Sequence, residues 1–64
     1  MNERFIIFTV RPITDVDVSI YTEDTRVNPE DREVVADTDK LIQTMTMISE
    51  VLKDEGFAVL FEVD

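Results

Sequence analysis

The most apolar stretch of the chain is a run of seven residues near its C-terminal end, residues 57–63, with the sequence Phe-Ala-Val-Leu-Phe-Glu-Val. So short a run of aromatic and branched side chains favours a β-strand. Alternate side chains of a strand lie on opposite faces. This strand would be apolar on both, with Phe57, Val59, Phe61 and Val63 on one face and Ala58 and Leu60 on the other. Such a strand needs cover on each face, from the chain itself or from a partner.

Two further strands are predicted in the N-terminal third of the chain. Residues 4–10 (Arg-Phe-Ile-Ile-Phe-Thr-Val) are rich in β-branched and aromatic side chains and are again apolar on both faces. Residues 15–22 alternate instead, which predicts a half-exposed strand with Val16, Val18 and Ile20 inward and Asp17, Ser19 and Tyr21 outward. The short connection between the two strands contains Pro12, which ends the first of them. Strands joined in this way usually form an antiparallel hairpin.

A helix is predicted over residues 40–55. Its core-facing stripe consists of Leu41, Met45, Ile48 and Leu52 at helical spacing, widened by Ile42 and Val51. Asp37 or Thr38 is a suitable N-cap, and Gly56 can adopt the left-handed conformation that ends a helix. A helix continuous from Pro29 would be about 40 Å long at ~1.5 Å per residue, longer than these strands, so a break near residues 37–39 is expected.

Residues 23–36 have two alternative interpretations. Asn28-Pro29-Glu30-Asp31 resembles a helix start but equally fits a surface turn, and Val34-Val35-Ala36 remains ambiguous. The sequence therefore predicts a single α+β domain over residues 1–64, with an antiparallel three-stranded sheet (β-β-α-β) and one main helix on one face.

One helix covers only one face of such a sheet, so the second face needs another cover. The candidates are a second copy of the chain, a different protein, or residues 25–36 folding back with Val27, Val34 and Val35. A chain of 64 residues without cysteine or histidine has neither disulfides nor the usual zinc ligands to stabilise it, which favours oligomerisation. A homodimer is therefore expected. The residues expected at its interface are Phe5, Ile7, Phe8, Leu60 and Phe61.

Charge bounds the class of partner. Fifteen acidic residues against six basic ones give a net charge of −9, which repels nucleic acids and anionic membranes and attracts basic surfaces. The same charge would arise from a need for solubility or from adaptation to salt. The lack of cysteine fits a reducing compartment, and no apolar run is long enough to span a membrane, so a cytoplasmic location is expected.

Acidic residues are concentrated between positions 15 and 39. Carboxylates spread over a rigid surface can imitate the phosphates of a nucleic acid and occupy the basic groove of an enzyme that binds it. The residues expected to contact such a partner are Glu23, Asp24, Glu30, Asp31, Glu33, Asp37 and Asp39, together with Tyr21 as an aromatic anchor. Met47 points away from the predicted core stripe and is a further candidate for a binding surface.

Catalytic and metal sites are not predicted. The chain lacks histidine, cysteine and a phosphate-binding loop, so no catalytic residues and no cofactor are expected. The pairs Asp15/Asp17 and Asp37/Asp39 have a spacing that can share Mg²⁺ or Ca²⁺, but neither belongs to a calcium loop, and a solvated strand edge and a helix cap explain them better.

The function expected from these features is that of a small acidic, non-catalytic regulator or inhibitor, for example one encoded by a phage. Its partner would be a basic, nucleic-acid-processing protein bound through the carboxylates. The alternative is a self-associating homodimer whose acidity serves only solubility.

Overall fold

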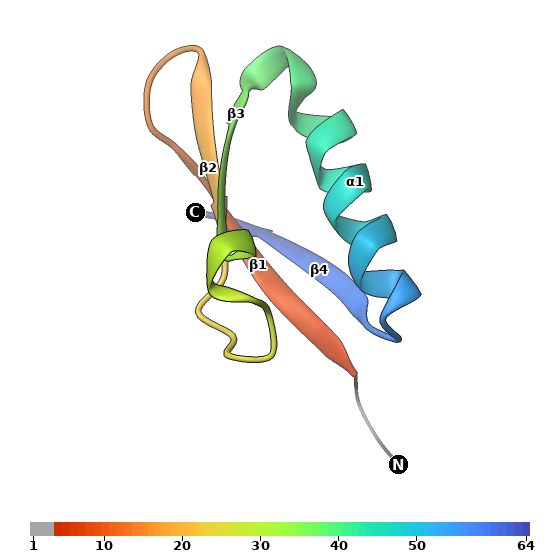
Figure 1. Ribbon diagram of the computed structural model, residues 1–64. Coiled ribbons are helices and arrows are strands. Elements are labelled where there is room, and N and C mark those ends of the chain that lie inside the picture. The colour runs from red at the N-terminus through yellow and green to blue at the C-terminus, as the bar shows by residue number, and fades with distance from the viewer. Residues whose placement is uncertain (1–3) are drawn as a thin grey trace.

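The computed structural model describes residues 4–64 and has the α+β class predicted from the sequence, with one helix lying on one side of a sheet (Figure 1). Its elements, in chain order, are β1 (Phe5–Pro12), β2 (Asp17–Tyr21), the 3-10 turn η1 (Pro29–Asp31), β3 (Glu33–Asp37), the 3-10 turn η2 (Thr38–Lys40), α1 (Leu41–Asp54) and β4 (Ala58–Val63).

The sheet has four strands in the order β3-β2-β1-β4, so the prediction of a three-stranded antiparallel sheet was wrong. The hairpin of β1 and β2 is confirmed as antiparallel. β4 pairs with β1 in parallel, and β3 pairs with β2 antiparallel. The sheet is therefore mixed, and α1 connects its two edge strands, β3 and β4, which run in the same direction.

The segment that the sequence left ambiguous forms β3. Backbone hydrogen bonds hold both of its ends, since Thr22 N–H donates to Arg32 C=O at 2.8 Å and Thr38 N–H donates to Val16 C=O at 2.8 Å. The break expected near residues 37–39 lies at the end of β3. There the carboxylate of Asp37 accepts a hydrogen bond from the backbone N–H of Asp39 at 2.8 Å and caps η2.

The hydrophobic core lies between α1 and the sheet face that α1 covers. It consists of Ile6, Phe8, Val10, Val18, Ile20, Val27, Ala36 and Leu52, with Leu41, Met45, Ile48, Phe57, Val59 and Phe61 packed against it. Ile42 and Val51 were expected to widen the core stripe of the helix but are 73% and 57% exposed. A helix contacts a sheet only along the stripe that faces it, so residues on the flanks of the stripe remain uncovered.

Gly56 ends α1 in the predicted way. Its φ of +93° lies in the left-handed region, where a side chain would be strained. Its backbone N–H donates to Lys53 C=O, and that of Phe57 donates to Leu52 C=O, each at 2.9 Å. The chain then enters β4 directly.

The opposite face of the sheet, called the open face below, is not covered by any element formed by residues 4–64 (Figure 1). Residues 25–36 do not fold back over it, because Val27 is buried in the core and Val34 and Val35 belong to β3. Val35 lies on the open face and is 59% exposed. In the structure, as expected from the sequence, the single helix covers one face of the sheet and leaves apolar side chains on the other face exposed.

Candidate protein-binding surface

On the half of the open face over β1 and β4, apolar side chains gather at one end, and Thr9, Arg11 and the exposed Glu62 occupy the other end. The register of this parallel pair aligns Phe5 with Ala58 and Ile7 with Leu60. The side chains of Ile7 and Leu60 are 42% and 49% exposed, so neighbouring side chains cover them only in part. Contiguous exposed apolar side chains of this kind mark interaction sites more often than isolated ones do.

The other half of the open face, over β2 and β3, carries three acidic side chains together with the exposed Val35. The register places Asp17 opposite Asp37 and Tyr21 opposite Glu33. Ser19 Oγ donates a hydrogen bond of 3.3 Å to a carboxylate oxygen of Glu33, which fixes that side chain above the sheet. Like charges directly across an antiparallel pair destabilise it; Asp37 accepts a hydrogen bond from the backbone N–H of Asp39 and Asp17 accepts one from Thr14 Oγ1.

Arg11 lies between the two halves but is held by other groups of the chain. Its Nε donates to a carboxylate oxygen of Asp64 at 2.7 Å, and its guanidinium lies 5.8 Å from the centre of the Tyr21 ring. The hydrogen bond to Asp64 raises the pKa of Arg11 further above its usual value. Tyr21, the predicted anchor, is thus half-buried on the open face beneath a cation.

The structure brings together only some of the predicted partner-binding residues. Glu33, Asp37 and Tyr21 share the open face, and Asp17 joins them although it was not selected. The other five lie elsewhere. They are Glu23 and Asp24 in the loop after β2, Glu30 and Asp31 on η1, and Asp39 in η2. Sequence position alone grouped carboxylates that the fold separates.

Phe8 and Phe61, predicted at a self-association interface with Phe5, Ile7 and Leu60, do not lie on the open face. Phe8 is only 1% exposed beneath α1, and Phe61 packs beside it with ring centres 6.0 Å apart. The sequence did not tell which alternate positions of β1 and β4 face the helix, so both sets were selected. Of these five residues, only Phe5, Ile7 and Leu60 are accessible to a partner on the open face.

Asp24 is committed to an internal contact. Its carboxylate accepts hydrogen bonds from Arg26 Nη2 at 2.7 Å, from Nε at 3.0 Å and from the backbone N–H of Arg26 at 2.9 Å. These hydrogen bonds lower the pKa of Asp24 from its usual 3.8 to about 2. Arg26 Nη2 also donates to Phe5 C=O at 2.8 Å, so the pair ties the loop after β2 to the start of β1.

The lowered pKa of Asp24 predicts a small, acid-sensitive contribution to stability. Because the folded pKa lies below the unfolded one, the stabilisation is complete above about pH 4 and is lost as the pH falls through 2. The pair is partly exposed, so we expect a contribution below about 1 kcal/mol. Urea unfolding of the wild type and of Asp24→Asn between pH 2 and 6 should show a stability difference that closes toward pH 2. A constant difference would contradict the assignment.

The aspartate pairs Asp15/Asp17 and Asp37/Asp39 belong to no larger cluster of potential metal ligands in the described part of the chain. Within residues 4–64, no three carboxylates, histidines or cysteines are grouped in a way that could hold a metal ion. The same residues form no helix that is both long and apolar enough to cross a membrane.

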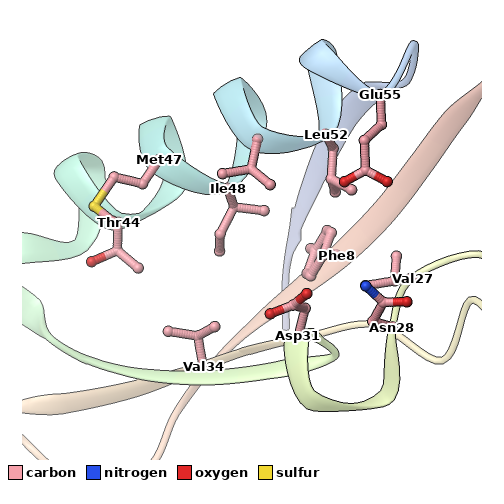
Figure 2. Close-up of a pocket in the computed structure, with 11 residues that line it drawn as sticks. Phe8, Val27, Asn28, Asp31, Val34, Thr44, Met47, Ile48, Leu52 and Glu55 are labelled. Atoms are coloured by element: carbon pink, nitrogen blue, oxygen red, sulfur yellow. The ribbon is translucent and has the colours of Figure 1, made fainter.

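A second surface, which sequence reasoning missed, is an apolar groove between α1 and η1, called the α1–η1 groove below (Figure 2). Its volume is about 170 Å³. Its lining residues are Phe8, Val27, Asn28, Asp31, Val34, Thr44, Met47, Ile48, Val51, Leu52 and Glu55. Three of these residues were named from the sequence as contact residues: Met47 and Asp31 as parts of a binding surface and Phe8 at a self-association interface. The groove itself forms because α1 packs over β3 beside η1, an arrangement that the sequence did not predict.

The open face and the α1–η1 groove are thus two surfaces of the described chain that combine apolar and acidic side chains. Comparison of the chain with protein family models, curated proteins and solved structures finds no match.

Proposed function

We propose that this chain is a small acidic, non-catalytic regulator or inhibitor that binds a basic protein partner through the open face. The observation that carries the proposal is that this face combines an apolar group around Ile7 and Leu60 with an acidic group of Asp17, Glu33 and Asp37. Protein–protein interfaces combine apolar and polar contact areas.

The partner is expected to be basic because the arginines of the chain make contacts within the chain. Each of the four arginines is engaged internally. Arg11 contacts Asp64, Arg26 contacts Asp24, Arg32 Nε donates to Val27 C=O at 2.8 Å, and Arg4 lies 4.9 Å from the ring centre of Phe57. Within residues 4–64, Asp24 and Asp64 form the two ion pairs. The acidic side chains of the open face are therefore left to attract a basic surface.

A nucleic-acid-processing enzyme is the class of partner that fits best. A groove that binds phosphates concentrates lysine and arginine, and carboxylates at the edge of a rigid sheet can compete for it. The residue composition supports a non-catalytic role, because histidine and cysteine, the commonest catalytic acid–base and thiol groups, do not occur in the sequence. A cytoplasmic location is part of the same proposal.

The experiment is capture of partners from a host-like lysate by the tagged chain at low and at high salt. We expect a basic protein that is retained at low salt and released at high salt, because screening weakens contacts between exposed charges. The triple variant Asp17→Asn, Glu33→Gln, Asp37→Asn should bind the purified partner about tenfold more weakly, at roughly 0.2–1 kcal/mol per exposed charge.

The matched control neutralises three exposed carboxylates on the helix side of the molecule, in η2 and on α1, in the variant Asp39→Asn, Glu50→Gln, Asp54→Asn. Both variants change the net charge equally, so non-specific attraction falls by the same amount in each. Equal loss of affinity in the two variants would show that the open face has no special role.

A second candidate function is self-association through the same face. It is favoured by the exposed apolar pair of Ile7 and Leu60, which a two-fold related copy could cover. A net charge of −9 on each copy, with acidic residues on the interface itself, opposes this arrangement. We therefore place it second to a basic partner.

A further inference from the structure

The α1–η1 groove is a surface where the apolar side of the helix has no cover. Val34 lies beneath it on β3 and is only half-buried, although it is on the covered face of the sheet. Met47 and Val51 approach it from α1 and are 59% and 57% exposed. Figure 2 shows Ile48 and Leu52 pointing from the helix toward Phe8 and the sheet. The groove therefore exposes apolar side chains of both layers of the domain.

The size of the groove limits what can enter it. An apolar cavity of ~150 Å³ is large enough to bind benzene, and the groove has a volume of about 170 Å³. It can therefore accept one aromatic ring or one branched aliphatic side chain. Insertion would bury Val34, Val51 and Met47, and burial of apolar surface is the main favourable contribution to association.

The charges around the groove determine which residues of a ligand fit beside the inserted apolar side chain. Its charged lining residues are Asp31, on η1, and Glu55, at the end of α1. In Figure 2 their carboxylates point toward the groove from opposite sides. The groove also reaches the C-terminal end of α1, where the helix dipole places partial negative charge. All of these groups favour a cation at the mouth.

We propose that the α1–η1 groove binds a segment of a protein partner in which one bulky apolar side chain is flanked by lysine or arginine. The apolar side chain occupies the space between Val34, Ile48 and Val51, and the basic side chains contact Asp31 and Glu55. This inference rests on the proposed function in one respect, namely that the segment belongs to the basic partner. It adds a second contact, on the covered side of the sheet.

The groove can be tested with the intact chain and a defined probe, without knowing the partner. The probe is the blocked tripeptide Lys-Phe-Lys, titrated into chain with labelled methyl groups while NMR shifts are recorded. We expect saturable shifts at Val34, Met47, Ile48 and Val51. Blocked Glu-Phe-Glu should bind at least tenfold more weakly, and Lys-Ala-Lys should give no saturable shift. Shifts confined to Ile7 and Leu60 would overturn the proposal.

Two variants separate the apolar from the electrostatic part of the site. Val51→Phe fills the groove from an exposed position, so it should abolish binding of Lys-Phe-Lys. The control Val63→Phe makes the same change at a residue that is 81% exposed and outside the groove, and it should bind normally. Asp31→Asn with Glu55→Gln should remove the preference for Lys-Phe-Lys over Glu-Phe-Glu. An unchanged preference, or binding by Val51→Phe, would count against the groove.

The tripeptide titration and the partner-binding experiment together distinguish an error in the groove assignment from an error in the proposed function. If a basic partner is captured through the open face and Lys-Phe-Lys shifts no groove methyl, the groove assignment is wrong and the proposed function stands. If Lys-Phe-Lys binds the groove and the two charge variants of the open-face experiment behave alike, the groove stands and the open face is not the partner site.

Discussion

Replacing Phe8 with alanine is expected to remove about 3–5 kcal/mol of stability, which is the usual cost of deleting a buried aromatic side chain. Phe8 is 1% exposed, lies beneath α1 and packs against Phe61. A domain of 64 residues is stable by only about 3–10 kcal/mol at the usual 0.05–0.15 kcal/mol per residue. The variant should therefore be largely unfolded near body temperature, with a melting temperature lowered by at least about 15 °C.

Phe5→Ala is the matched control because it deletes the same side chain from the same strand on the opposite face. Phe5 is 37% exposed on the open face, so its loss should cost about 1–2 kcal/mol. Thermal and urea unfolding of both variants, followed by circular dichroism, measures the difference. Equal losses of stability in the two variants would contradict the observation that α1 covers only one face of β1. Phe8→Leu should fall between them, since the cavity is smaller.

Local patterns of residues predicted much of this fold because their causes are local. The stripe of Leu41, Met45, Ile48 and Leu52 predicts an amphipathic helix, and all four residues pack on the core. The only glycine, Gly56, predicts where that helix ends, since few other residues adopt its φ of +93°. The hairpin of β1 and β2 follows from two β-rich runs with a short loop between them, and Pro12 is the last residue of β1.

The remaining elements depend on contacts between distant segments. β3 begins with Glu33 and ends with Asp37, residues that disfavour strands, and it is held by pairing with β2 and not by propensity. The parallel pairing of β4 with β1 joins the two ends of the chain and has no local signature. Because neither pairing can be read from local patterns, the sequence could not show which face of the sheet α1 covers or how many strands the sheet has.

Some of the residues predicted for binding surfaces lie together on the open face, namely Phe5, Ile7, Tyr21, Glu33, Asp37 and Leu60, and the others do not. Apolar side chains on both faces of the strand at 57–63 indicated an uncovered face, and that face exists. Its acidic group depends on the register of β2 with β3, which places Asp17 beside Asp37 and leaves Asp31 on the other side of the sheet, at the groove. A run of carboxylates in sequence therefore divides between two surfaces.

The double variant Ile7→Thr, Leu60→Thr is expected to weaken binding of the basic partner about 30-fold while leaving the fold intact. The two residues are aligned on β1 and β4, and each is about half exposed before binding. Covering the remaining apolar surface should be worth about 1 kcal/mol per residue, half the value for full burial. Two such losses give about 2 kcal/mol, where 1.4 kcal/mol is a tenfold change in affinity. Threonine is β-branched and therefore suits a strand at both positions.

Binding of the purified partner by isothermal titration measures this loss, with Val16→Thr, Val63→Thr as the control. Both control residues are exposed, at 58% and 81%, and neither belongs to the open face, so the control should bind normally. Light scattering on the wild type separates the two candidate functions, because a heterologous partner leaves the free chain at 7.4 kDa. Twice that mass, reduced to the monomer by Ile7→Thr, Leu60→Thr but not by the control, would assign the open face to a second copy. An unchanged affinity in the double variant would instead leave the carboxylates as the whole of the binding surface, since the apolar group would then contribute nothing to the complex.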